Sequence, residues 1–577
     1  MTRGCAWLLG DDAPAPALVP EALGEEHRLI ARTAEEFVLQ EVLPALPDLE
    51  RKRWDVARAL VARAGALGLI AADVPEAVGG VGLDKAASVV IGDAIGACPS
   101  FATTFGAQSG LAIIPLLCFG TPEQQQRYLP RIASGEILGA YCLSESGSGS
   151  DALGARARAT RLEDGSWSLT GEKMWISNGG FADLFVVFAK VDGERFSAFL
   201  VERGFPGVST GAEEHKMGLH GSSTTPLVLQ EARVPAANLL GEIGAGHKIA
   251  FNVLNYGRFK LGAMCSGGAR AALLEAIRYA AGRRQFGRPI ASFGAIRHKI
   301  AEMTVRVYAV ESMLYRTAGM IDAALPEGAD GRAIAAALEE FAVEASLLKI
   351  ASSEAIDYVV DENVQIHGGN GFVADYPAER RYRDARVNRI FEGTNEINRL
   401  VVPAQILKRG RAGRLPLADA AARAESEMRG DPRAGSGASI AVVQRMKATA
   451  VWLLGRAVRR HGEALDQEQE VLMLIADVVT DAFAAESAML RAGAARRAGH
   501  RSAALHADAA DVFVHDAARR ADTAAAIALA ALDEDGDPAA AGRPATLVAA
   551  PRVDTIAARR RIAEAALAGS RYIFSIT

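Results

Sequence analysis

Apolar residues recur every three or four positions along the first part of the chain, which is the spacing of an amphipathic helix. Proline and glycine residues separate the segments that carry this pattern. The pattern predicts helices at residues 25–43, 56–69 and 86–95. We therefore expect residues 1–136 to form an N-terminal α-helical domain.

From about residue 137, apolar and polar positions alternate, as they do in a strand with one buried face. Asp-Gly and Gly turns separate the strand-like runs. These runs lie at residues 167–170, 184–189, 197–201 and 225–229. We expect a small middle β domain over residues 137–240.

The helical period then returns and continues to about residue 408. Its long amphipathic segments predict helices at residues 250–281, 298–320, 333–359 and 395–407. We expect residues 241–408 to form a helical bundle. The order of these elements gives an α+β fold class that is mainly α.

The composition changes beyond residue 408. The basic residues that open this part are Lys408, Arg409, Arg411 and Arg414. We expect residues 409–439 to be a basic and flexible linker, with its flexible stretch at residues 431–439. A basic run can contact anionic lipid or can simply be solvated, and both alternatives stay open.

Residues 440–577 predict a C-terminal helical domain. Its helices are expected at residues 440–462, 468–498, 503–532 and 553–568, with an acidic loop at residues 533–544. Residues 300–316 align without gaps onto residues 475–491. Either the tail is a degenerate copy of the helical bundle, or two alanine-rich helices match by chance. We expect packing rather than catalysis from the tail.

Charge and cysteine usage exclude some classes of protein. The chain has 577 residues, of which 50% are hydrophobic, and a formal net charge of -5. Because 64 basic residues are outnumbered by 69 acidic ones, we do not expect a nucleic-acid-binding protein. The cysteines are Cys5, Cys98, Cys118, Cys142 and Cys265. They lack paired metal-ligand spacing, so we expect a reducing compartment with neither zinc nor disulfides.

Hydropathy and the N-terminus bear on localisation. We read no apolar stretch of the roughly 20 residues that a bilayer span needs. The N-terminus resembles neither a secretory signal nor an Arg-rich transit peptide. We expect a cytoplasmic protein, with peripheral contact at the inner membrane surface as an open alternative.

The stretch Ile390-Phe391-Glu392-Gly393-Thr394-Asn395 places one carboxylate among hydrophobes and a glycine. Apolar neighbours can desolvate Glu392, which makes a carboxylate a stronger base. Gly393 permits close approach of a ligand, and Thr394 and Asn395 can cap a helix that begins near Glu396. On its own, the same pattern also fits a solvated loop glutamate.

Five stretches in order carry a resemblance to a known family. They are Tyr141–Asp151, Lys173–Gly180, Arg283–Gly287, Gln365–Gly371 and Phe391–Thr394. Residues 25–408 resemble the acyl-CoA dehydrogenases, flavin enzymes that desaturate fatty acyl thioesters. The long tail resembles the very-long-chain branch of that family.

The resemblance implies FAD as cofactor, acyl-CoA as substrate and no metal. It implies FAD contacts at Tyr141, Leu143, Ser144, Gly149, Ser150, Trp175, Ile176, Ser177, Arg283, Gln285, Phe286, Gln365, Gly368, Gly369, Thr394 and Glu396. It implies substrate contacts at Ser150, Asn255, Arg258 and Gly393. Six of these residues resemble positions that bind the diphosphate and adenine of FAD across a subunit interface. They are Arg283, Gln285, Phe286, Gln365, Gly368 and Gly369. Shorter relatives pair two dimers into a tetramer through one surface of the bundle, and the resemblance implies that the tail covers this surface. We therefore expect a homodimer.

The resemblance also implies the roles of the catalytic groups. Glu392 would be the base, its backbone N–H and a ribityl hydroxyl of FAD would bind the thioester oxygen, and flavin N5 would accept hydride. Some relatives carry their base where this chain has Gly257, which leaves Glu392 alone in that role. The chain departs from the family at Ser146, where proline is usual, and at His367, where an apolar residue is usual. We interpret His367 as a histidine satisfied by backbone.

The remaining expectations concern function. Family analogy implies electron-transferring flavoprotein as acceptor and a place in fatty acid β-oxidation. The glycine-rich loop at residues 74–83 lacks the setting of a dinucleotide fingerprint, so we do not expect a nicotinamide cofactor. Thr103 and Ala107 stand at positions that resemble the tunnel floor of medium-chain relatives, where longer polar residues are usual, and Gly106 and Gly110 lie nearby. The resemblance therefore implies a preference for long acyl chains, unless other side chains refill the space. A flavin-bearing scaffold, or an enzyme for an unusual or carrier-bound acyl group, stays open as the alternative.

Overall fold

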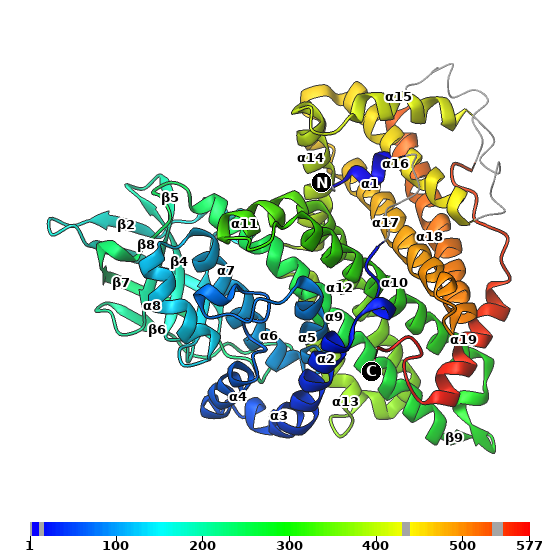
Figure 1. Cartoon of the computed structure of the whole chain (residues 1–577), viewed down its shortest axis with the longest axis horizontal. Helices are drawn as coiled ribbons and strands as arrows, with labels where there is room; N and C mark the ends of the chain where they lie inside the picture. The colour runs from blue at the N-terminus through cyan, green and yellow to red at the C-terminus, as the bar shows by residue number, and fades with distance from the viewer. Residues whose placement is uncertain (1–2, 11–16, 430–438, 534–545, 577) are drawn as a thin grey trace.

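The computed structural model describes the chain except residues 1–2, 11–16, 430–438, 534–545 and 577. The first part of the chain is helical, as the apolar period predicts (Figure 1). Its helices are α1 (Ala6–Leu9), α2 (Glu25–Phe37), α3 (Leu43–Glu50), α4 (Trp54–Ala66), α5 (Lys85–Ile95), α6 (Pro99–Gly106), α7 (Ile113–Phe119) and α8 (Pro122–Ala133). Single π-helical segments join α2 to α3 at Val38–Val42 and α6 to α7 at Ala107–Ala112. Such segments often mark functional sites.

The middle part of the chain forms a twisted sheet. Its strands are β1 (Gly139–Cys142), β2 (Arg158–Arg161), β3 (Trp167–Ser177), β4 (Leu184–Val191), β5 (Arg195–Glu202), β6 (Val208–Thr210), β7 (Thr224–Val234) and β8 (Leu239–Leu240). The strand order is β6-β7-β3-β2-β4-β5-β8, and β1 pairs in parallel with β4. The predicted runs lie in β3, β4, β5 and β7. The other strands are too short to show a period of their own.

Two long helices and their neighbours form the bundle beside the sheet. The helices are α9 (Gly246–Gly282), α10 (Gly294–Ala324), α11 (Gly331–Glu340), α12 (Ala342–His367), α13 (Pro377–Ala385) and α14 (Asn395–Arg411). A hairpin of β9 (Arg284–Gln285) and β10 (Arg288–Pro289) follows α9. The single helix predicted at residues 333–359 is wrong. The backbone leaves the helix at Phe341, with φ -101° and ψ 24°, and this separates α11 from α12.

The tail is helical as well. Its helices are α15 (Leu417–Met428), α16 (Ser439–His461), α17 (Gln469–Arg497), α18 (Ala503–Leu532) and α19 (Thr555–Gly569). Helix α15 contradicts the prediction of a flexible linker across residues 409–439, because alanines such as Ala420 and Ala424 bury one face of this segment. The flexible stretch expected from residue 431 and most of the acidic loop at residues 533–544 lie outside the described residues.

The basic run after residue 408 is partly structural. Arg409 is buried and donates to the carbonyl oxygen of Glu339 at 3.2 Å. Arg414 forms an ion pair with Glu340. One of the four basic side chains, Arg409, is therefore used inside the protein, and Arg414 forms its ion pair at the surface.

One apolar segment contradicts the hydropathy prediction. Pro99–Phe119 is 21 residues long, with a mean hydropathy of 1.4, and is apolar enough by length and composition to cross a membrane. In the structure, 83% of its most apolar window is buried inside the protein. The segment spans α6, the π-helical segment and α7, so its apolar character is that of a core helix.

The two segments that align in the sequence pack against each other. Arg491 on α17 donates to the carboxylate of Glu311 on α10 at 2.6 Å, and Arg316 on α10 donates to Glu486 on α17 at 2.7 Å. The sequence alignment equates Glu311 with Glu486 and Arg316 with Arg491. The two ion pairs are thus reciprocal, which is the contact pattern of a two-fold axis.

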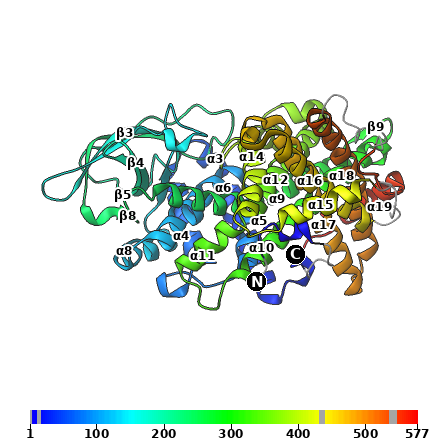
Figure 2. The same ribbon diagram turned by 90° about the horizontal axis from the view of Figure 1, so that it is seen from above.

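The sheet and the β9 hairpin lie at opposite ends of the molecule. Figure 1 shows the sheet at one end and β9, close to α19, at the other, and the view from above agrees (Figure 2). The bundle lies between them. Residues on the sheet and on the hairpin therefore cannot meet within one copy of the chain.

Candidate active site

The loop that carries Glu392 joins a short 3-10 turn, Arg386–Arg389, to helix α14. Glu392 has φ 57° and Gly393 has φ 79°, so both lie in the left-handed region. A non-glycine residue there is strained and needs support from its surroundings. The Oγ1 of Thr394 accepts the backbone N–H of Ile397 at 3.3 Å, and this confirms Thr394 as the predicted N-cap.

Two side chains hold the backbone of this loop. Asn398 Nδ2 donates to the carbonyl oxygens of residues 392, 393 and 394 at 3.4, 2.9 and 3.0 Å. Arg258 Nε on α9 donates to the carbonyl oxygen of Glu392 at 3.2 Å. Asn398 was not predicted from the sequence, because its partners are backbone carbonyl groups, which every residue carries.

Asn255 and Arg258 are buried behind the loop. Arg258 Nη1 donates to Asn255 Oδ1 at 3.1 Å and to Ser346 Oγ at 3.5 Å. Burial lowers the pKa of Arg258 to about 10, although the nearby Glu392 opposes this. The structure therefore places both predicted substrate contacts where they support the loop.

The carboxylate of Glu392 is desolvated. Its Oε2 atom is buried and has no hydrogen-bond partner within the described residues. Burial raises the pKa of Glu392 to about 7, while the positive charges of Arg258 and Lys349 act in the opposite direction. A Cβ atom placed on Gly257 would lie 2.5 Å from Oε2, so only glycine leaves room for the carboxylate here. The alternative that Glu392 is a solvated loop glutamate is therefore wrong.

Glu392 opens onto a cavity of about 100 Å³ between α9 and the α6–α7 segment. Ser177 at the end of β3 lines the same cavity, as do Phe391 and Gly257. The structure thus brings together residues from β3, α9 and the base loop. The small residues Thr103, Gly106, Ala107 and Gly110 line it as well.

Larger side chains from α9 partly refill the space beside the small residues. A Cβ atom on Gly106 would lie 3.2 Å from Met264 Cε, and one on Gly110 would lie 3.4 Å from the ring of Tyr256. Thr103 and Ala107 line the cavity beside these filled positions. The alternative that other side chains refill the space is therefore correct in part.

The end of β3 presents an aromatic ring to solvent. The register of β3 with β7 shifts between Lys173 and Ile176, which is a β-bulge, and Trp175 within it has φ 57°. A bulge re-aims a side chain, and Trp175 is 57% exposed. Ile176 beside it is buried in the sheet, and Ser177 faces the cavity.

The loop after β1 lies against this bulge. The backbone N–H of Met174 donates to the carbonyl oxygen of Ser144 at 2.9 Å. Glu145 anchors the loop by accepting from Lys173 Nζ at 2.7 Å and from the backbone N–H of Ala157 at 3.0 Å. These bonds hold the loop in place although Ser146 stands where proline is usual in the family. The predicted contacts Tyr141, Leu143, Ser144, Gly149 and Ser150 belong to β1 and this loop.

Thr394 and Glu396, also predicted FAD contacts, lie at the start of α14 next to Glu392. Six other predicted FAD contacts lie at the other end of the molecule. Arg283, Gln285 and Phe286 belong to the β9 hairpin, where Phe286 is 91% exposed. Gln365, Gly368 and Gly369 lie at the C-terminal end of α12. The structure does not bring these two groups to Glu392. His367 Nδ1 forms a hydrogen bond with the carbonyl oxygen of Asn363 at 2.8 Å, as expected of a histidine satisfied by backbone.

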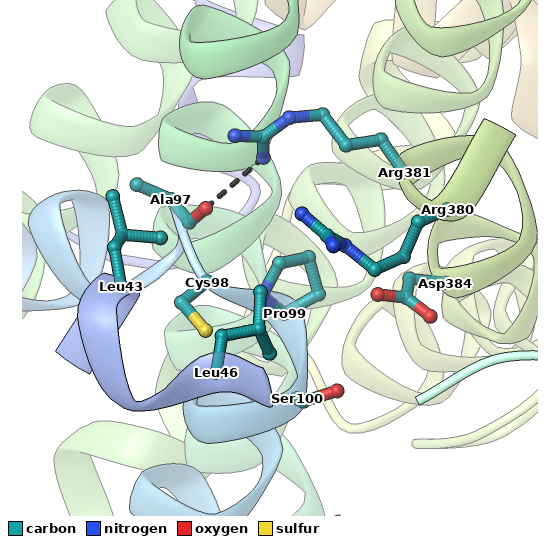
Figure 3. Close-up of a pocket in the computed structure, with 9 residues that line it drawn as sticks. All are labelled: Leu43, Leu46, Ala97, Cys98, Pro99, Ser100, Arg380, Arg381 and Asp384. Carbon is teal, nitrogen blue, oxygen red and sulfur yellow. Dashed lines mark hydrogen bonds between the residues drawn. The ribbon is translucent and has the colours of Figure 1, made fainter. Parts of the chain in front are cut away.

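A second, smaller pocket adjoins the first (Figure 3). Its volume is about 10 Å³, and it shares Pro99 and Asp384 with the larger cavity. Arg381 Nη1 donates across it to the carbonyl oxygen of Ala97 at 3.0 Å. Asp384 accepts the backbone N–H of Leu219. These bonds tie α13 to the α5–α6 turn and to the loop between β6 and β7.

Comparison with known proteins identifies the family. Family models described as the N-terminal, middle and C-terminal domains of acyl-CoA dehydrogenase match residues 24–136, 140–232 and 244–407, and a second C-terminal domain model matches residues 445–541. A probable acyl-CoA dehydrogenase of Bacillus subtilis is 46% identical over 544 residues, which cover 92% of each chain. The chain belongs to the acyl-CoA dehydrogenase family.

Two further relatives extend this finding. The very long-chain specific acyl-CoA dehydrogenase of human mitochondria is 35% identical over 511 residues, which cover 82% of this chain and 75% of that one. A crystal structure of acyl-CoA dehydrogenase complexed with FAD from Bacillus anthracis superposes with a TM-score of 0.94 at 43% identity. It covers 99% of this chain and all of that one. The similarity therefore includes the tail.

The acyl-CoA dehydrogenase fold and FAD dependence apply to this chain, which is an oxidoreductase acting on CH–CH groups with a flavin acceptor. Its residues fit a flat aromatic cofactor. The exposed ring of Trp175 lies next to a loop where Cβ atoms on Gly147 and Gly149 would meet nothing within 4 Å. In the part of the chain that the structure describes, no group of three or more His, Cys, Asp or Glu side chains could hold a metal ion.

Proposed function

We propose that this acyl-CoA dehydrogenase uses Glu392 as the base that removes the α-proton of an acyl-CoA thioester. The observation that carries the proposal is the buried, unpartnered Oε2 of Glu392 facing Gly257 in an apolar cavity. A carboxylate whose pKa is raised to about 7 holds and releases a proton near neutral pH. Glu392 accepts the α-proton, the β-hydrogen leaves with its electron pair, and the electron pair of the α C–H bond forms the double bond.

The backbone of the base loop supplies the second catalytic group. The N–H of Glu392 donates to no acceptor in the described part of the chain, so it is free to bind the thioester oxygen as enolate charge develops. Asn398 and Arg258 fix this N–H by holding the carbonyl groups of the loop. When bound, FAD accepts the hydride that leaves the β-carbon.

We propose that the FAD contacts come from two copies of the chain. Trp175, Ile176, Ser177 and the loop after β1 would hold the flavin ring, with Ser150 also reaching the CoA portion of the substrate. The hairpin and α12 residues would hold the diphosphate and adenine of FAD in the other copy. The distance between the two ends of the molecule supports this division, because a single chain cannot bring both sets to one FAD.

We propose a homodimer as the assembly. The reciprocal pairs Glu311–Arg491 and Arg316–Glu486 mean that α17 of the tail covers the face of α10 as a second copy of α10 would. The tail therefore occupies, within the chain, the surface through which dimers would otherwise pair.

We propose long acyl chains as the preferred substrates. Thr103 and Ala107 give the cavity wall small side chains, and each further buried methylene adds roughly 0.8 kcal/mol to binding. Met264 and Tyr256 narrow the cavity beside Gly106 and Gly110, so the preference is expected to end at a definite length.

We further propose electron-transferring flavoprotein as the acceptor, fatty acid β-oxidation as the pathway and the cytoplasm as the location. The absence of a dinucleotide fingerprint in the sequence at residues 74–83 supports a protein acceptor over nicotinamide. Burial of Arg409 and the ion pair of Arg414 with Glu340 reduce the number of basic side chains that lipid could engage. Reduction of purified electron-transferring flavoprotein by substrate-reduced enzyme tests the acceptor.

The competing function is a flavin-bearing scaffold. The desolvated position of Glu392 favours catalysis, because a scaffold has no need of a carboxylate held in strained backbone. Anaerobic titration of the FAD-loaded protein with a panel of acyl-CoA thioesters distinguishes the two. We expect bleaching of the flavin by long-chain thioesters, and a flavin that no thioester bleaches would support the scaffold.

A further inference from the structure

The base loop is tied to helix α12 at the point where α14 begins. Asn395, the first residue of α14, lies three positions after Glu392 and is only 3% exposed. Its Nδ2 donates to Ser353 Oγ at 3.1 Å and to Glu354 Oε1 at 3.0 Å, and both of these residues lie on α12. The side-chain amide therefore uses its two donors to hold the start of α14 against α12.

A buried lysine completes this contact. Lys349 lies on α12 one turn before Ser353 and is fully buried. Its Nζ donates to Asn395 Oδ1 at 2.6 Å, and among the described residues no carboxylate forms an ion pair with it. An ammonium ion is thus buried against a neutral amide, although buried charges in proteins are normally paired with an opposite charge.

The carboxylate on which this ammonium acts is that of Glu392. Together with Arg258, the positive charge of Lys349 favours the ionised form of Glu392 and opposes the effect of burial on its pKa. Burial lowers the pKa of Lys349 to about 8, while Glu392 acts in the opposite direction. Lys349 is therefore mostly protonated at the pH at which Glu392 titrates.

The other groups that act on this pair keep one charge state through that pH range. They are Tyr141 on β1, Arg258 and Cys265 on α9, and Glu396 on α14. Burial raises the pKa of Tyr141 well above its usual range and that of Cys265 to about 12, so both are neutral. Arg258 keeps a pKa of about 10, and its own backbone N–H lowers the pKa of Glu396, so both are charged. A rise in activity around neutral pH therefore reports the ionisation of Glu392.

We propose that Lys349 is a positioning residue for the base: through Asn395 it fixes the loop that presents Glu392 to the cavity, and it places a positive charge beside the carboxylate. The loop needs such support because Glu392 and Gly393 both lie in the left-handed region. Without the contact the loop can leave the geometry that proton transfer requires. This inference rests on the proposed role of Glu392 as the base.

The test is the pH profile of kcat/KM for Lys349→Met, measured on FAD-loaded protein with one long-chain acyl-CoA between about pH 5.5 and about pH 9. Methionine keeps an unbranched side chain but has neither the charge nor the donor. We expect the plateau at high pH to fall by about tenfold or more, because the base is less well placed.

The midpoint of the rise is expected to move to higher pH by about one unit. Removing a neighbouring positive charge raises the pKa of Glu392 further, so more alkaline solution is needed to ionise it. A purely structural role for Lys349 would lower the plateau and leave the midpoint in place. That result, or a profile equal to that of the wild type, would overturn the inference.

Two further variants complete the design. Asn395→Leu removes the amide and keeps the lysine, and its plateau is expected to fall as in Lys349→Met; a wild-type plateau would show that Lys349 does not act through Asn395. If Lys349→Met does not fold or bind FAD, Asn395→Leu decides. Lys447→Met is the matched control, because Lys447 is a buried lysine of the tail helix α16 that pairs with Glu486. We expect it to leave the midpoint and the plateau unchanged, and a shift of the midpoint as large as in Lys349→Met would count against the inference.

The proposed base and the proposed positioning residue fail in different ways. If Glu392→Gln reduces the flavin as fast as the wild type does, the base falls and the role of Lys349 falls with it. If Glu392→Gln loses flavin reduction while Lys349→Met keeps the wild-type profile, only the role of Lys349 falls.

Discussion

Replacing Glu392 by glutamine is expected to make the protein more stable while it removes the base. Raising the pKa of a carboxyl group from 4.5 to about 7 means that its ionised form costs about 3 kcal/mol in the folded protein. Below about pH 4.5 the carboxyl group is protonated in both the folded and the unfolded chain, so the cost is absent. It grows as the pH rises to about 7 and is complete above that. Glutamine never ionises and escapes the cost.

The assay is thermal unfolding of FAD-loaded protein at equal concentration, for wild type and Glu392→Gln, between about pH 5 and about pH 8. We expect the variant to gain Tm relative to wild type as the pH rises through this window. Glu163→Gln is the control, because Glu163 is exposed and lies outside the candidate site. Equal differences in Tm at both ends of the pH range would refute the reasoning.

Three further predictions follow from the same site and packing. kcat/KM is expected to rise about tenfold per pH unit up to about pH 7 and then level off; a flat profile would contradict the raised pKa of Glu392. Ala107→Glu is expected to shorten the preferred acyl chain without loss of turnover on short thioesters, and an unchanged length profile would show that this position does not limit the cavity. Sedimentation of the intact protein is expected to give a homodimer, whereas tetramers would contradict the substitution of α17 for a second copy.

Much of the fold follows from local pattern. Helix α2 buries one face, at Ala31, Ala34 and Phe37, so its apolar period is visible in the sequence. The break between α11 and α12 is not visible, because apolar residues continue through Phe341 while its backbone turns out of the helix. Helix α15 was hidden by the alanine-rich, charged composition of its segment, which resembles a linker.

Some residues of the candidate site could be predicted from the sequence and others could not. Glu392 and Gly257 could be singled out from motifs, and the structure brings them within contact. Asn398 could not, because its partners are carbonyl groups of the backbone. The contact of Lys349 with Asn395 joins residues 46 positions apart, and no spacing in the sequence indicates it. The roles of the predicted FAD contacts stay predictions.

The most direct test of the account is flavin reduction in Glu392→Gln. The variant is mixed anaerobically with a long-chain acyl-CoA, and the loss of flavin absorbance is followed over time. The amide keeps the shape of the side chain but is no base, so we expect FAD content and thioester binding to persist while reduction slows by several orders of magnitude. Reduction at a rate close to that of the wild type would show that Glu392 does not remove the α-proton.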